Sequence, residues 1–309
     1  MKTRRAEVDL LRAFGIILMV LGHVGLGNQF SHFIHAFHMP MWFIVSGYFV
    51  NIDSDVKHYV QKRFKSLIIP YLCWGIPFEI AISSFGTGGY WIDGVLFPNV
   101  KANGTQWFFL ALFISTTIGF LILKYFSPKY GGWVCFLFGV LASVHPFSMP
   151  LAIDSALVGI GFFGIGYILK SFPGILEMTP KKVVSLGLVC FVLIFINPEV
   201  NMRTNAYNHV LLFWANGIIA TVLLWNCAKL IVNKASHIPD CVIEVGRESI
   251  IYPSINHVII RFSNMGIAKM ALRFNPIFYK SVLFFSIMLF CFQLNRVLKK
   301  GKLKFLVGR

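Results

Sequence analysis

Residues 106–124 read QWFFLALFISTTIGFLILK, an almost uninterrupted apolar run that ends at Lys124. A helix that crosses the hydrocarbon core of a bilayer needs about 20 mostly apolar residues, each of which rises about 1.5 Å. This stretch has that length, and no charged residue interrupts it before its last position. It therefore predicts a transmembrane helix.

The whole chain has the same character. Of its 309 residues, 57% are hydrophobic and only 13% are charged, and the mean hydropathy is +0.71. Soluble domains average about 45–50% apolar and about 25% charged residues, so this composition excludes a soluble globular protein, a disordered chain, a coiled coil and a secreted disulfide scaffold. We predict an all-α, polytopic membrane protein that forms a single transmembrane domain over residues 1–309. Its ten expected helices are 10–27, 33–50, 66–84, 106–124, 132–146, 151–170, 183–198, 207–232, 249–263 and 276–298.

The charge pattern predicts the orientation. An even number of spans places both termini on one side, and cytoplasmic segments collect lysine and arginine. With the termini inside, most of the 28 Lys and Arg residues lie on the inner side. The outer side keeps only Lys101, Arg203, Arg261, Lys269, Arg273 and Lys280. Both termini are therefore expected to be cytoplasmic in a multi-pass protein of the cell (inner) membrane.

The net charge of +16 would suggest a nucleic-acid partner in a soluble protein. In a chain of this composition it is explained first by topology, so we expect the lipid bilayer as a partner and no nucleic acid. No A-x-A-like cleavage site follows the first apolar stretch, and we expect no cleaved signal peptide.

The first expected helix carries an unusual row of polar residues, Arg5, Asp9, Arg12 and His23. At about 100° per residue, Arg12 and His23 share one face, and Asp9 lies about 40° from it. Arg12 and His23 are separated by a rise of about 16 Å, which places Arg12 near the inner boundary and His23 well inside the bilayer. Ionisable groups at this depth are costly and mark either a site or a structural partner. The stacked row favours a site.

The second expected helix begins with His32, His35 and His38 and ends with Ser46, Gly47 and Tyr48. His35 and His38 are neighbours on one helix face. A metal site needs three or more converging ligands, and no carboxylate lies nearby in the sequence. We therefore expect a polar pocket open to the outer face, and no metal.

Three other polar segments leave alternatives open. The basic loop 51–65, with Lys62 and Arg63, is explained by topology and anionic lipids or by a phosphate ligand. Glu79 and Asp154 are each interpreted as structural hydrogen-bond acceptors in preference to catalytic partners. Gly246 and Ser249 predict a helix start, which places His257 toward the outer leaflet and the cavity of His38.

Four of these stretches resemble the acyltransferase-3 family of integral membrane acyltransferases. They are the row from Arg5 to His23, the segment FHMPMWFIVSGYF at 37–49, the pair Lys62-Arg63 running on to Pro70, Tyr71 and Trp74, and WFFL at 107–110. The second is similar to the family signature FHMPLFFFLSGYF. The chain departs from the late family pattern G-x-x-S-L-x-I-Y-x-x-H, because Tyr252 comes one position early and His257 one position late.

The resemblance implies transfer of an acyl group, most often acetyl, from cytoplasmic acyl-CoA to a hydroxyl of a glycan or lipid-linked saccharide. An imidazole, whose ordinary pKa is about 6.5, suits removal of the hydroxyl proton, so His23 is the expected base or transient acyl carrier. Asp9 joins it in the expected catalytic set. Arg12, Lys62 and Arg63 are expected to bind the CoA phosphates, since arginine and lysine are the usual phosphate partners. The expected acceptor-binding residues are His38, Ser46, Tyr48, Trp107 and His257.

Two other functions stay open at this point. A proton- or ion-coupled transporter would use His23, Glu79 and Asp154 as a path, but it predicts inverted repeats, which the sequence lacks. A polyprenyl-phosphate-dependent glycosyltransferase would use the basic loop with Asp53 and Asp55. Self-association into a homo-oligomer is compatible with each interpretation.

Overall fold

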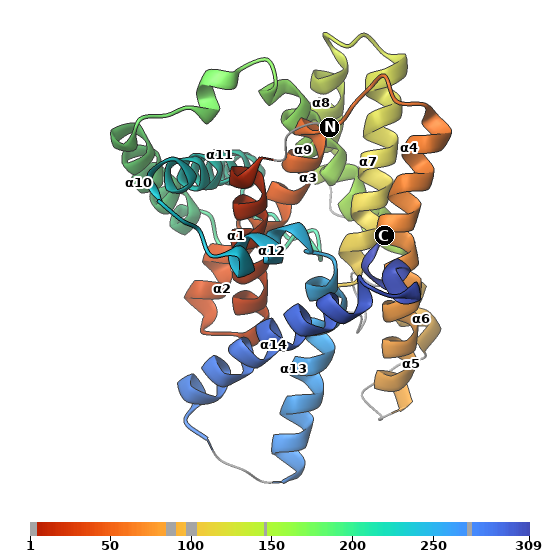
Figure 1. The fold of residues 1–309 in the computed structure, drawn as a ribbon. Helices are drawn as coiled ribbons and strands as arrows, with labels where there is room; N and C mark the ends of the chain where they lie inside the picture. The colour runs from red at the N-terminus through yellow and green to blue at the C-terminus, as the bar shows by residue number, and fades with distance from the viewer. Residues whose placement is uncertain (1–4, 85–90, 97–103, 145–146, 271–273) are drawn as a thin grey trace.

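A computed structural model describes residues 5–84, 91–96, 104–144, 147–270 and 274–309 (Figure 1). Over these residues the fold is all-α, as predicted, apart from one isolated antiparallel bridge between Asn201 and Ala206. The helices are α1 (Ala6–Val24), α2 (Asn28–His35), α3 (His38–Tyr48), α4 (Val56–Arg63), α5 (Ile76–Ser84), α6 (Trp91–Leu96), α7 (Trp107–Tyr125), α8 (Gly131–Val144), α9 (Ile153–Leu169), α10 (Pro180–Ile196), α11 (Val210–Lys234), α12 (Asp240–Arg247), α13 (Ile251–Lys269) and α14 (Pro276–Leu298).

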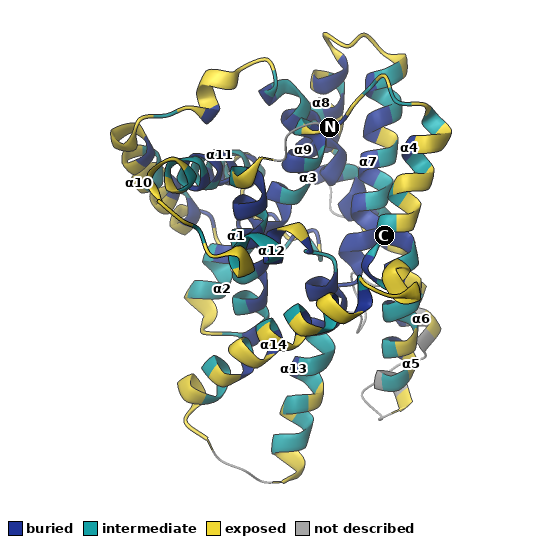
Figure 2. Cartoon of the chain, viewed as in Figure 1, coloured by how far each residue is buried: buried dark blue, intermediate teal, exposed yellow. Residues whose placement is uncertain are grey.

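Four helices are long and apolar enough to cross a bilayer among the residues that the structure describes. They are α7, α9 with the 3₁₀ turn before it (Pro150–Leu169), α11 and α14, and α8 is a shorter apolar helix. The outward faces of α10 and α14 expose large apolar side chains, among them Leu188 and Phe285, each about two-thirds accessible (Figure 2). Exposed apolar surface on this scale is typical of contact with lipid. The chain is a membrane protein, and the count of ten spans stays a prediction.

The core forms where α3, α7 and α8 pack along α9. Gly139 of α8 and Gly161 of α9 face each other so closely that a Cβ at either position would overlap the other backbone. Small residues allow this approach in membranes, where helix association depends on close packing. On the other side, α1 lies against α11, α12 and α13.

The expected helix 33–50 is two helices, which corrects the prediction. The chain turns at Ala36 and Phe37, and Phe37 adopts φ −146° and ψ −21°. Pro40 then lies in the first turn of α3, where its missing N–H has no intrahelical acceptor to lose. The break sets α2 and α3 at different directions and leaves His35 and His38 side by side, with ring centroids 5.3 Å apart.

The expected loop 51–65 is also wrong over its second half. A helix begins after Asp55, whose carboxylate accepts a hydrogen bond of 2.9 Å from the amide of His58, which is a typical N-cap. It continues from α4 through two π-helical turns, η1 (Phe64–Ile68) and η2 (Tyr71–Gly75), into α5. The wider turns flank Pro70, which cannot donate its amide to the preceding turn.

The helix expected over 249–263 begins at Ile251, close to Ser249, but Gly246 does not start it. Gly246 lies in the last turn of α12, and a three-residue turn separates it from α13. A Cβ on Gly246 would overlap the carbonyl of Asp9, so the glycine is required for α12 to cross α1 closely. This crossing places the α12–α13 turn beside the polar face of α1.

Candidate active site

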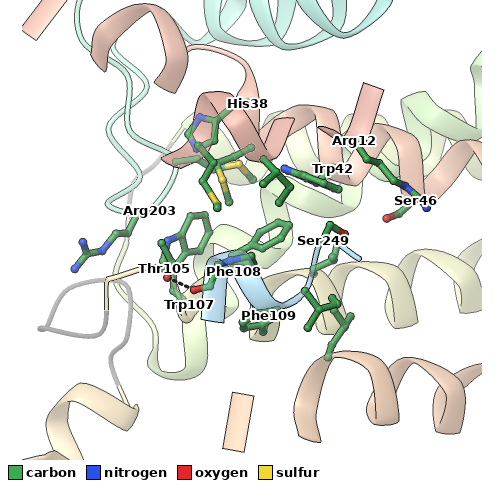
Figure 3. Close-up of a pocket in the computed structure, with 18 of the residues that line it drawn as sticks. Arg12, His38, Trp42, Ser46, Thr105, Trp107, Phe108, Phe109, Arg203 and Ser249 are labelled. Atoms are coloured by element: carbon green, nitrogen blue, oxygen red, sulfur yellow. Dashed lines mark hydrogen bonds between the residues drawn. The ribbon is translucent and has the colours of Figure 1, made fainter. Parts of the chain in front are cut away.

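One cavity of about 420 Å³ lies between α1, α3, α7 and the α12–α13 turn (Figure 3). On α1 it is lined by Arg12, Ile16, Met19 and His23. Their spacings of four, three and four residues make a single stripe along one helix face, with a rise of about 16 Å from end to end. The cavity therefore follows α1 for about half the thickness of a bilayer's hydrocarbon core.

A second stripe, on α3, runs in the opposite direction. His38, Trp42 and Ser46 line the cavity at steps of four residues, so they also share one face. Figure 3 shows His38 toward the end that also holds Arg203, and Ser46 beside Arg12 at the other. The cavity thus has two chemically distinct ends, which we call the arginine end and the histidine end.

The arginine end brings together three basic side chains from distant parts of the sequence. Arg12 comes from α1, Arg63 from α4 and Arg247 from α12, and Ser46, Ser66 and Ser249 line the cavity with them. Arginine guanidinium groups and serine hydroxyls both donate hydrogen bonds, so this end is suited to an anion rich in acceptor oxygens.

Asp9 holds one member of this set in place. Its carboxylate lies 3.6 Å from Nε of Arg247 and is almost fully buried, whereas the Arg247 side chain is 42% accessible. Asp9 does not line the cavity as the described residues delimit it; it stands behind Arg247. The carboxylate expected to act in catalysis is therefore placed to orient an arginine.

The C-terminal segment packs against the same region. Arg309 forms an ion pair of 2.6 Å with Glu248, and Arg296 and Lys299 both pair with Glu244. The indole N–H of Trp74 donates a hydrogen bond of 2.8 Å to the carbonyl of Leu306. These contacts link the last residues to α12 and to the helix that carries Arg63.

The histidine end contains His23, His35 and His38. Nδ1 of His38 lies 2.9 Å from the carbonyl of Ile34. Because a carbonyl only accepts, Nδ1 carries the proton, and neutral His38 keeps Nε2 as an acceptor. His257 of α13 meets His23 edge-on, with ring centroids 6.4 Å apart. The imidazoles thus gather at the histidine end of the cavity.

No group of three or more His, Cys, Asp or Glu side chains that could hold a metal ion is found among the described residues. The six cysteines are free thiols, as their scattered positions predict.

Comparison with protein families shows which family the chain belongs to. The model of the Acyltransferase 3 family, an acyltransferase domain, matches residues 5–243. The chain belongs to this family. No curated protein and no solved structure matches it. It is accordingly an acyltransferase of the class that transfers groups other than aminoacyl groups, which favours the enzyme over the transporter and glycosyltransferase alternatives.

The acyltransferase brings six of the residues selected from the sequence to this cavity. They are Arg12, His23, His38, Ser46, Arg63 and Trp107. Four others lie elsewhere. Lys62 is exposed, Tyr48 packs against Trp225 with ring centroids 4.7 Å apart, Asp9 stands behind Arg247, and His257 stands behind His23 against Gly104.

Two further arginines, Arg203 and Arg247, line the acyltransferase cavity, and the sequence patterns do not indicate them as site residues. Arg247 follows the family match, which ends at residue 243, and it lies at the end of α12, a helix that is not among the ten expected from the sequence. Arg203 lies in a loop without periodicity. In each case the sequence signal was the charge alone.

Asp154 is a structural acceptor, as expected. Its two oxygens accept hydrogen bonds from the amides of Ser155 (2.7 Å) and Met149 (3.1 Å) at the start of α9. Glu79 is buried, and its Oε2 has no hydrogen-bond partner among the described residues. Glu79 lies within electrostatic range of Arg261 and Arg203, which places its carboxyl group near the histidine end.

Proposed function

We propose that this acyltransferase transfers an acyl group, acetyl in the simplest case, from cytoplasmic acyl-CoA to a hydroxyl of an extracytoplasmic or lipid-linked saccharide. The observation that supports this most directly is one continuous cavity with three arginines at one end and three histidines at the other. A multi-pass protein of the cell membrane would thereby connect a donor on one side with an acceptor on the other.

The arginine end would bind the donor. Arg12, Arg63 and Arg247 offer guanidinium forks that match phosphate oxygens, and the adjacent serines supply further donors. The distance of about 16 Å along α1 then requires a thin, extended group between the phosphates and the reacting carbonyl. The pantetheine arm of CoA has that form, and the apolar side chains of Ile16 and Met19 line its path.

His23 would perform the chemistry at the far end. As a base, its imidazole removes the proton of the acceptor hydroxyl while the oxygen attacks the thioester carbonyl. The carbon–sulfur bond breaks and the CoA thiolate leaves, taking a proton from the imidazolium. As a carrier, the imidazole attacks the thioester and CoA leaves as the thiol with the imidazole N–H proton. The hydroxyl oxygen then attacks the acyl carbonyl, the carbon–nitrogen bond breaks, and the hydroxyl proton returns to the imidazole.

The remaining residues would position these reactants. His38, Ser46 and Trp107 line the cavity. We propose that His38 and Trp107 contact the acceptor and that Ser46 contacts the donor. Asp9 acts through Arg247, and His257 acts through His23. Tyr48 and Lys62 lie away from the cavity and have no direct role in this proposal.

The test is transfer by purified protein in vesicles given labelled acetyl-CoA and a candidate saccharide. We expect labelled product with the wild type and almost none with His23→Ala. His237→Ala is a matched control, because His237 is an exposed histidine outside the cavity. Unchanged transfer by His23→Ala would refute the role of His23, and no binding of any acyl-CoA by the wild type would refute the donor.

A further inference from the structure

The loop of residues 197–209, between α10 and α11, places a fourth arginine in the cavity. Asn201, Met202 and Arg203 from this loop line it. Figure 3 shows Arg203 on the His38 side, remote from Arg12. An arginine at this end is separated from the donor-binding arginines by most of the cavity's length, so the donor phosphates do not account for it.

The 197–209 loop is held in one conformation by its own side chains. Asn201 and Ala206 exchange backbone hydrogen bonds of 2.7 and 3.1 Å, and the Asn201 amide oxygen accepts from the backbone N–H of Arg203 at 3.0 Å. Tyr207 donates its hydroxyl proton to Asn205 at 2.6 Å. Asn205 lies in the left-handed region at φ +55°, which asparagine tolerates better than most residues.

Neighbouring helices fix the loop from outside. The hydroxyl of Ser155 on α9 donates to the carbonyl of Met202 at 3.0 Å, and Met202 is buried. The backbone carbonyl of Asn197 accepts a hydrogen bond of 2.8 Å from Nε2 of His32. The side-chain oxygen of Asn197 accepts one of 3.1 Å from the backbone N–H of His209. The backbone of Arg203 is thus held in a fixed position by the loop. Residues that determine ligand specificity are often found on ordered loops of this kind.

The surroundings of Arg203 favour an anion. The described residues that line the cavity include four arginines and three histidines but no aspartate or glutamate. Arg203 and His23, the proposed catalytic residue, both line the cavity, and Glu79 is buried outside its lining. A ligand that reacts at His23 therefore lies within the field of a guanidinium.

We propose that Arg203 recognises an anionic group on the acceptor, either the carboxylate of an acidic sugar or the phosphate of a lipid-linked one. A guanidinium binds both groups through paired, charge-assisted hydrogen bonds. The acceptor would be anchored by its charge at the 197–209 loop while the hydroxyl to be acylated faces His23. This inference rests on the proposed transfer function and adds the class of acceptor.

The experiment compares charged and neutral acceptors in nanodiscs, where both membrane faces are accessible. One pair is 4-nitrophenyl β-D-glucuronide and its methyl ester. The other is glucose linked to a decyl chain through a phosphate, and decyl glucoside. Transfer from labelled acetyl-CoA is measured as kcat/KM for the wild type, Arg203→Gln and Arg261→Gln. Arg261 interacts with Glu79 as Arg203 does but does not line the cavity, so it is the matched control.

We expect the wild type to prefer the anionic member of at least one pair by about tenfold, and the preferred pair identifies the source of the anion. Arg203→Gln should abolish that preference and leave the neutral probe within about twofold, whereas Arg261→Gln should keep the preference. Equal use of charged and neutral probes by the wild type, acceptance of neither anionic probe, or an equal loss on both members in Arg203→Gln would overturn the proposal. Absence of acetyl-CoA binding would instead refute the underlying transfer function.

Discussion

The arginines at the two ends of the cavity are held by different kinds of structure. At the arginine end, the charged side chains come from helices α1, α4 and α12, and a buried carboxylate and C-terminal ion pairs hold α12 in place. At the histidine end, Arg203 comes from a loop fixed by asparagine and tyrosine hydrogen bonds. Packed helices hold their side chains in fixed positions, whereas the sequence of a loop can change without disturbing the core.

This difference suggests a division of labour between the ends. In our proposal the helical arginine end binds the acyl donor, and the 197–209 loop meets the acceptor. Substitutions at the two ends should therefore separate in their kinetic effects, and the following predictions test that separation.

The largest effect is expected at the histidine end, from His23→Ala. General acid–base catalysis by a positioned group contributes about 10²–10⁴-fold, so kcat should fall by that factor. Binding of acetyl-CoA, measured by calorimetry in nanodiscs, should change by less than about threefold, because the arginines are untouched. If acetyl-CoA affinity is lost along with kcat, the separation of binding from chemistry is wrong.

The same variant distinguishes the two roles of His23. A carrier accumulates labelled acetyl on the protein when no acceptor is present, and the label should be absent from His23→Ala. A base shows no protein-bound label in either protein.

A smaller effect is expected at the arginine end from Arg12→Gln. A hydrogen bond to a charged group is worth about 1.5–3 kcal/mol, so KM for acetyl-CoA should rise about tenfold to a hundredfold. The thioester of N-acetylcysteamine, which lacks the phosphates, should be used equally well by wild type and variant. Lys62→Gln is the matched control, because Lys62 is exposed beside Arg63 and does not line the cavity. An equal loss on both donors would mean that Arg12 acts on the chemistry.

A still smaller effect is expected from Asp9→Asn, which removes the carboxylate behind Arg247. Because Arg247 is partly exposed, the pair is worth about 1 kcal/mol, and KM for acetyl-CoA should rise about two- to fivefold with kcat unchanged. Arg247→Gln should produce the larger rise, and the double variant should match Arg247→Gln alone. Additive effects of the two substitutions would show that Asp9 does not act through Arg247.

The sequence predicted those parts of the site that depend on regular helix geometry. Arg12 and His23 lie eleven residues apart on one uninterrupted helix, so their common face follows from the helical repeat alone. The same repeat explains two residues that do not reach the cavity. Tyr48 follows Ser46 by two positions and points about 200° away, toward Trp225, and Lys62 lies about 100° from Arg63.

The parts that the sequence did not predict depend on breaks in the helices. Arg247 reaches the cavity because it is the last residue of α12 and because the neighbouring Gly246 allows α12 to cross α1 closely. Arg203 reaches it because tertiary hydrogen bonds fold the 197–209 loop over α9. Neither feature has a hydrophobic period, and each needs partners from distant segments, so local patterns carry no signal for them.

The smallest effect is expected away from both ends, at the ion pair of Glu177 and Lys229. A hydrogen bond from Lys229, 2.7 Å long, together with its charge lowers the pKa of Glu177 below the ordinary value of 4.5. The pair therefore stabilises the fold above pH 4.5, and that contribution is lost as the pH falls through the lowered pKa. In detergent, wild type and Glu177→Gln should differ slightly in Tm at pH 6 and converge below about pH 4. Because the pair is exposed, acetyl transfer should be the same in both proteins. A change in KM for either the donor or the acceptor in Glu177→Gln would show that this surface ion pair is coupled to the cavity. That result would contradict the independence of the two regions that we infer from the structure.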